Sequence, residues 1–146
     1  MAVTTGYPAQ VRTVSNGAHH ALVILWVAFV LAPLCAGIDK FFDFLTNWDQ
    51  YLSPIVTHYV NGNLFMHAVG VIEIVAAVIV ALTPRVGAYI VAIWLLGIIA
   101  NLISMHAYYD IALRDFGLFL GAIALARLAQ YFKTLESNQT VPQMPV

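Results

Sequence analysis

Hydrophobic positions along the chain fall into four long blocks separated by short polar stretches. The blocks cover residues 18–38, 63–82, 88–105 and 111–132. Each is close to the length of about 20 apolar residues that a helix needs to cross the hydrocarbon core of a bilayer. The pattern therefore predicts an all-α protein, a bundle of four transmembrane helices that forms a single domain over residues 18–133.

The composition agrees with a membrane protein. Hydrophobic residues make up 62% of the chain and charged residues 9%, and the mean hydropathy is +0.85, whereas soluble domains carry about 25% charged residues. A net charge of −1 offers no basic surface for nucleic acid. The single cysteine, Cys35, excludes an intramolecular disulfide and a cysteine-rich metal or iron–sulfur site. The polar ends, residues 1–17 and 134–146, are expected to be mobile tails.

The long connection between the first two spans, residues 39–61, mixes acids with aromatic residues. Apolar side chains recur there near helical spacing, at Phe41, Phe44, Leu45, Trp48, Leu52 and Ile55. Acids at Asp39, Asp43 and Asp49 can face water, so the pattern predicts an amphipathic interfacial segment that Pro54 divides in two. It either anchors the bundle as an aromatic belt or forms a lid over a site between the helices.

One acid, Glu73, lies near the middle of the second span. A charge at that depth costs at least about 2.5 kcal/mol, so the side chain must be protonated, paired, or turned toward a polar interior. Its helical face carries small residues such as Gly70, Ala76 and Ala77, which favours an orientation into the bundle. Glu73 is either a proton, quinone or ion site, or a neutral acid that is hydrogen-bonded to a neighbouring helix.

The third and fourth spans carry polar and small residues that indicate helix packing. Trp94, Gly97, Asn101 and Ser104 share one face of the third span. We expect Asn101 to bond across to another helix, with Glu73 as one available partner.

In the fourth span, Gly117 and Gly121 form a small-xxx-small pair that predicts close packing and could support a homo-oligomer. Asp110 precedes Arg114 by four residues, so a structural pair of these two side chains is available.

The basic residues predict the orientation. Four lie at one end of a four-span bundle, namely Arg12, Arg85, Arg127 and Lys133, against Lys40 and Arg114 at the other. The positive-inside rule then places both termini in the cytoplasm. The opposite end holds the aromatic connection and His58, His67 and His106, which form a polar mouth above Glu73 and Asn101.

Such a mouth could oxidise or reduce a quinone. In that hypothesis His67, His106 and Glu73 transfer protons, and Asn101, Trp94 and Trp48 line the pocket. Haem b held by His67 and His106 is a weaker alternative, because two histidines near helix ends arise readily by chance and the chain has no haem-attachment motif.

Three other roles remain open. The spacing of His58, His67 and His106 gives no argument for a metal site. In a non-catalytic auxiliary subunit, Glu73 and the Asp110–Arg114 pair would hold the fold together. A transporter is a more distant alternative, since four spans lack room for the paired repeats of many carriers unless the protein oligomerises.

Four short motifs carry a resemblance to a known family. Gly37-Ile38-Asp39-Lys40, Gly70-Val71-Ile72-Glu73, the connection Pro84-Arg85-Val86-Gly87-Ala88, and Asp115-Phe116-Gly117 together resemble the DoxX-like family over residues 21–128. These are small four-helix proteins of the bacterial inner membrane, and the small subunit of a thiosulfate:quinone oxidoreductase is among them.

The resemblance implies a multi-pass protein that works with the subunits of a quinone-linked oxidoreductase, or a structural subunit of a larger membrane complex. It implies no firmly bound cofactor, although quinone is an expected ligand. Lys40 and Glu73 match the family's Gly-x-x-Lys and Gly-x-x-Glu positions. His67 and His106 are not part of the family pattern, so their roles rest on the residues alone.

Overall fold

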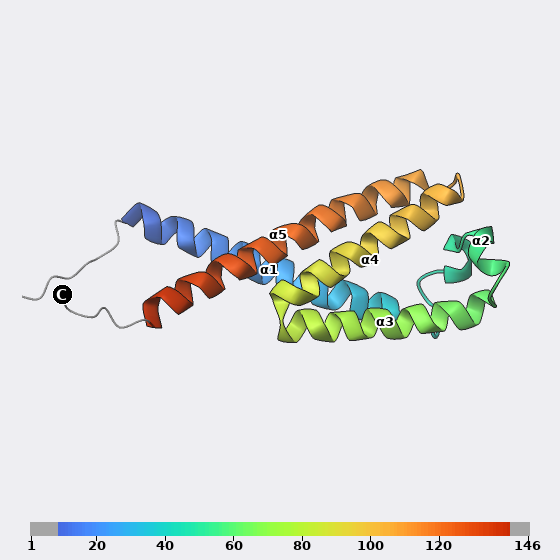
Figure 1. Ribbon diagram of the computed structural model, residues 1–146, viewed down its shortest axis with the longest axis horizontal. Helices are drawn as coiled ribbons and strands as arrows, with labels where there is room; N and C mark the ends of the chain where they lie inside the picture. The colour runs from blue at the N-terminus through green and yellow to red at the C-terminus, as the bar shows by residue number, and fades with distance from the viewer. Residues whose placement is uncertain (1–8, 141–146) are drawn as a thin grey trace, which may run out of the picture.

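The structure is a computed structural model that describes residues 9–140, with side chains described over 16–137. It contains α1 (Ala9–Asp39), η1 (Trp48–Tyr51), α2 (Pro54–Thr57), α3 (Gly62–Leu82), α4 (Pro84–Ser104) and α5 (Tyr109–Thr140) (Figure 1). The described residues form helices and their connections, with no strand. The predicted all-α class is therefore confirmed.

The four long helices lie as two antiparallel pairs. α1 packs against α3 and α4 packs against α5, and the two pairs cross one another (Figure 1). Thr83 alone separates α3 from α4, and Pro84 opens α4 at a position where its missing N–H costs no hydrogen bond. The tight connection brings the two pairs together at this end of the molecule.

The core sits where the four helices meet. Small side chains dominate it, with Ala76 and Val80 from α3 and Ala122 and Ala126 from α5. Small residues let helix backbones approach closely, which is how helices associate in lipid. The Trp26 indole of α1 donates a hydrogen bond to the Val80 carbonyl at 3.2 Å and ties the first helix to this core.

Of the two glycines predicted to pack closely on α5, only Gly121 lies against another helix. A Cβ at Gly121 would lie 3.2 Å from the Phe29 ring of α1, so this glycine makes the expected close contact. A Cβ at Gly117 would meet nothing within 4 Å. Gly117 therefore lies on an open face of α5.

Three predicted helix boundaries were wrong. α4 starts at Pro84, so residues 84–87 are helical where a connection was expected. α1 starts at Ala9 and α5 continues to Thr140, so residues 9–17 and 134–140 are helical where tails were expected. Polar helical ends of this kind lack the apolar period that marks a membrane span, so hydropathy does not reveal them. The rest of both predicted tails, residues 1–8 and 141–146, lies outside the described residues.

Three helices among the described residues are long and apolar enough to cross a membrane: Asn16–Asp39, Gly62–Leu82 and Pro84–Ser104. The outward faces of these helices are rich in large apolar side chains, such as Ile24 and Ile93, which are 69% and 71% exposed. A surface of that kind fits contact with lipid tails. α5 has 32 residues and carries several charges, and it is not among the three.

The connection between α1 and α3, residues 40–61, forms a cap segment over the far end of α1. The amphipathic helix predicted up to Pro54 is absent, and a turn, η1 and α2 replace it. Short side-chain caps fix these pieces, because Asn47 accepts from the Asp49 N–H and Ser53 from the Ile55 N–H. Trp48 and Leu52 pack inward, while Phe44 and Ile55 are exposed.

Candidate functional site

A buried ion pair joins the end of α1 to α3. Lys40 Nζ, one residue beyond α1, donates a hydrogen bond to Glu73 Oε2 of α3 at 2.6 Å. The two side chains are only 4% and 9% exposed. At a rise of about 1.5 Å per residue, Glu73 lies about 17 Å along α3 from Gly62, so the pair sits at mid-helix depth. The orientation of Glu73 into the bundle is thus as predicted, but its partner is Lys40.

Two glycines explain how the pair forms. A Cβ at Gly37 would lie 2.7 Å from the Gly70 carbonyl oxygen, and a Cβ at Gly70 would lie 2.7 Å from the Gly37 carbonyl oxygen. Real Cβ atoms are not found so close, so both positions need glycine for the backbones to touch. Lys40 and Glu73 each follow one of these glycines by three residues, about one turn, and the antiparallel crossing brings their side chains together.

The end of α1 favours a positive charge at this point. Asp39 is the last residue of α1, and the carbonyl groups of its final turn carry the negative end of the helix dipole. Lys40 Nζ lies 3.5 Å from the Ala36 carbonyl oxygen, within this turn. The positive charge of the Lys40 ammonium therefore balances both the partial negative charge at the end of α1 and the negative charge of the Glu73 carboxylate.

The third side of the ammonium is covered by an aromatic ring. Lys40 Nζ lies 3.7 Å from the ring centroid of Trp48, at the start of η1. The Trp48 indole N–H donates to Asp39 Oδ2 at 2.8 Å. Trp48 of the cap segment thus covers the Lys40 side of the ion pair.

Two further polar groups approach Glu73 from other helices. The indole N–H of Trp94, on α4, faces the Glu73 carboxylate, and its Nε1 is buried without a hydrogen bond of ordinary geometry among the described residues. Asp115, on α5, is buried and close enough for its charge to repel Glu73. The site therefore draws on all four long helices.

The predicted Asp110–Arg114 pair was wrong. Arg114 Nε donates to Asp115 Oδ1 at 3.1 Å, while Asp110 is exposed in the first turn of α5. Arg114 itself is 66% exposed, so this pair stabilises little by Coulomb attraction and instead gives the buried Asp115 a partner.

Asn101 is hydrogen-bonded to the cap segment and not to Glu73. Its Nδ2 donates to the Tyr51 carbonyl at 2.6 Å, and its Oδ1 accepts from the Ser53 N–H at 3.0 Å. Ser104 donates to the Ser53 hydroxyl at 3.0 Å. The expected interhelical bond is therefore a bond from α4 to the cap segment.

The histidines do not converge on Glu73. The ring of His67 stacks on Phe41 with 5.1 Å between centroids. His106 is exposed, and its Nδ1 lies 3.1 Å from the Ile103 carbonyl oxygen of its own helix end. His58 contacts Tyr59. Among the described residues no cluster of three metal-ligating side chains occurs.

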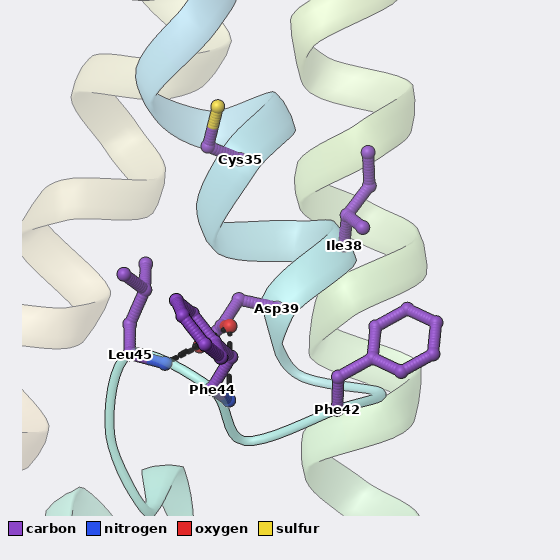
Figure 2. Close-up of a pocket in the computed structure, with 6 residues that line it drawn as sticks. All are labelled: Cys35, Ile38, Asp39, Phe42, Phe44 and Leu45. Atoms are coloured by element: carbon purple, nitrogen blue, oxygen red, sulfur yellow. Dashed lines mark hydrogen bonds between the residues drawn. The ribbon is translucent and has the colours of Figure 1, made fainter.

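Two apolar hollows lie near the ion pair. One, of about 530 Å³, is at the end of α1, where Figure 2 shows Asp39 reaching toward the backbone of Phe44 and Leu45 below Cys35. The other, of about 480 Å³, runs between α3 and α4 and is lined by aliphatic side chains and Trp94. Ile72 and Ala76, which flank Glu73 on α3, line this second hollow, which we call the α3–α4 groove.

Sequence reasoning identified Glu73, Trp94 and Trp48 as site residues and missed the direct role of Lys40, which it assigned to the outer connection. The signal was present, since Gly-x-x-Lys and Gly-x-x-Glu have the same spacing. Comparison with family models, with curated proteins and with solved structures finds no match to this chain, so the likeness to the DoxX-like family rests on the four motifs alone.

Proposed function

We propose that this chain is a four-span protein of the bacterial inner membrane, with both termini in the cytoplasm, that serves as a subunit or partner of a quinone-linked oxidoreductase of DoxX-like type. Its centre is the Lys40–Glu73 pair. The observation that carries the proposal is the buried Trp94 N–H, which has no hydrogen bond of ordinary geometry within the described part of the chain. It faces the Glu73 carboxylate of this pair and backs the α3–α4 groove.

The energetic argument starts from the cost of the pair. Burying an ammonium and a carboxylate costs several kcal/mol per ion, which their attraction offsets only with close geometry. Apolar residues of similar volume would often give equal stability. A pair kept at mid-helix depth in an apolar protein therefore favours a role in moving protons or binding a polar ligand.

The groove supports a quinone as that ligand. Its walls are aliphatic, which suits an isoprenoid chain, and Trp94 provides a buried indole N–H that makes no hydrogen bond of ordinary geometry with any described residue. Buried donors are almost always bonded, and a quinone carbonyl oxygen is an acceptor. Reduction of a quinone consumes two electrons and two protons. In this proposal a partner oxidoreductase supplies the electrons, and Glu73 passes protons.

Before Glu73 can take up a proton, its hydrogen bond from Lys40 has to weaken, because the ammonium favours the charged acid. Asp115, from α5, is the second acid in reach of this charge. His67 and His106 lie toward the capped end, and in this proposal they take part in proton exchange with the aqueous side.

The second candidate function is a structural or assembly subunit without a ligand. The contacts of Lys40 favour it, because the ammonium is surrounded by Glu73, Trp48 and the Ala36 carbonyl of the same chain. In that case the pair only locks α1 onto α3.

Binding of decylubiquinone to the purified protein in lipid nanodiscs separates the two. The first proposal predicts saturable quenching of tryptophan emission that exceeds that in empty nanodiscs. Trp94→Phe should weaken binding by about two- to tenfold, because it removes the N–H that donates to the quinone carbonyl and such a hydrogen bond contributes about 0.5–1.5 kcal/mol. Glu73→Gln should leave the protein assembled. Asp43→Asn, an exposed acid of the cap segment, is the matched control. Quenching that never saturates, together with loss of assembly in Glu73→Gln, would favour the structural role.

A further inference from the structure

Asp39 is a buried acid whose bonds all go to the cap segment. Its Oδ1 accepts from the backbone N–H groups of Phe44 and Leu45, each at 3.1 Å, as Figure 2 shows. Its Oδ2 accepts from the Leu45 N–H at 3.1 Å and from the Trp48 indole at 2.8 Å. One carboxylate thus fixes the first turn of the cap segment and one aromatic ring.

Trp48 transmits this constraint to the ion pair. The ring face lies over Lys40 Nζ, and Trp48 also packs against the cluster of Leu52, Met66 and Val69. An ammonium over a tryptophan face is attracted by the ring quadrupole, most strongly where water is excluded. The indole N–H lies at the ring edge, so its bond to Asp39 sets the angle at which the face meets the ammonium.

We propose that Asp39 is a positioning residue for the Lys40–Glu73 pair: through its hydrogen bond to the Trp48 indole, it holds the ring over the Lys40 ammonium and keeps the pair closed to water. Asp39 touches neither Lys40 Nζ nor Glu73 in this role. This proposal concerns the same ion pair as the proposed function. It is tested by the accessibility of Lys40 to a labelling reagent, whereas the proposed function is tested by quinone binding, so one can fail while the other holds.

An asparagine at this position cannot replace the acid. The Asp39 carboxylate accepts from three N–H donors on two oxygens, whereas an asparagine side chain has one accepting oxygen and an NH₂ group that only donates. Asp39→Asn therefore frees either the backbone turn or the Trp48 indole while side-chain size stays almost the same.

Lysine labelling measures the enclosure. The chain has two lysines, Lys40 and the exposed Lys133, which serves as the internal reference. The full chain in nanodiscs is treated with the N-hydroxysuccinimide ester of acetic acid, and acetylation of each lysine is followed by mass spectrometry. In the unaltered chain Lys40 should react far more slowly than Lys133, and equal rates would overturn the proposal whatever the variants do.

The variants test the role of Asp39. Asp39→Asn should raise the labelling of Lys40 relative to Lys133 by about five- to thirtyfold, the range that follows from losing a desolvated ring–ammonium contact. Asp43→Asn, the same change at an exposed acid of the cap segment, should leave the ratio unchanged. Trp48→Phe keeps a smaller aromatic ring and removes the indole N–H that bonds to Asp39, so it should also raise labelling. It carries the test if Asp39→Asn does not fold.

The double variant and the tryptophan emission separate positioning from a general loosening of the loop. Asp39→Asn should add nothing in the Trp48→Phe background, since it acts through that ring. The emission of Trp48, taken as the difference between the chains with and without Trp48→Phe, should shift to longer wavelength in Asp39→Asn. Additive labelling effects, or an unchanged Trp48 emission with increased labelling, would overturn the proposal.

Discussion

Removing one member of the buried ion pair should cost far more than removing both. Lys40→Met leaves the Glu73 carboxylate, 9% exposed, without its hydrogen bond from the ammonium. An uncompensated buried charge of this kind costs about 3–5 kcal/mol. Methionine is close in length to both side chains, so the double variant Lys40→Met/Glu73→Met exchanges the pair for apolar contacts. Its stability should lie within about 1 kcal/mol of the unaltered protein, or above it.

The assay is unfolding in mixed micelles with increasing SDS, followed by helical circular dichroism. The four proteins of the cycle give an interaction free energy that should be at least about 2 kcal/mol. Lys133→Met is the matched control, and because Lys133 is exposed, its effect should stay within about 0.5 kcal/mol. Single variants that each cost less than about 1 kcal/mol and add simply in the double would refute the reasoning, since they would mean that the two charges are not paired in the folded protein.

Two further predictions concern the contacts that build the site. Gly70→Ala places a methyl group 2.7 Å from the Gly37 carbonyl oxygen and should lower the free energy of unfolding by about 1–3 kcal/mol, measured in the same micelles. Gly97→Ala, where a Cβ meets nothing within 4 Å, should be neutral or stabilising, and an equal loss at both glycines would contradict the proposed close contact. Asn101→Ala should cost about 1–3 kcal/mol and speed hydrogen exchange at residues 51–53, because it removes the partners of buried backbone groups there; unchanged exchange would show that Asn101 does not hold the cap segment.

Hydropathy correctly predicted the all-α class and located three long apolar helices. The second span was predicted within one residue, because α3 has an abrupt apolar start and the Thr83-Pro84 step ends it. The start of α1 and the end of α5 were missed because these outer turns are polar and lack the apolar pattern of a membrane span. The amphipathic period in residues 39–53 also misled, because Asp39 accepts backbone N–H groups there and replaces a helix with a turn.

At the candidate site, too, the sequence predicted one residue of the ion pair and missed the other. Glu73 was found from one fact, an acid in an apolar span, and that fact also predicted its orientation. Its partner was not found, because the positive-inside count treated Lys40 as a loop residue, whereas the Gly37–Gly70 contact places the end of α1 beside the middle of α3. Pairings between distant helices depend on such crossings, and periodicity within one helix carries no information about them.

Chemical coupling of Lys40 to Glu73 tests the central claim most directly. Dicyclohexylcarbodiimide enters membranes and activates buried carboxylic acids, and an amine in contact with the activated acid displaces the urea to form an amide. The ion-pair geometry, with 2.6 Å between Nζ and Oε2, predicts an intramolecular amide between these two side chains, seen by mass spectrometry as joined peptides that have lost one water. Glu73→Gln should abolish it. A Glu73 that is modified by the reagent while Lys40 remains a free amine would contradict the account.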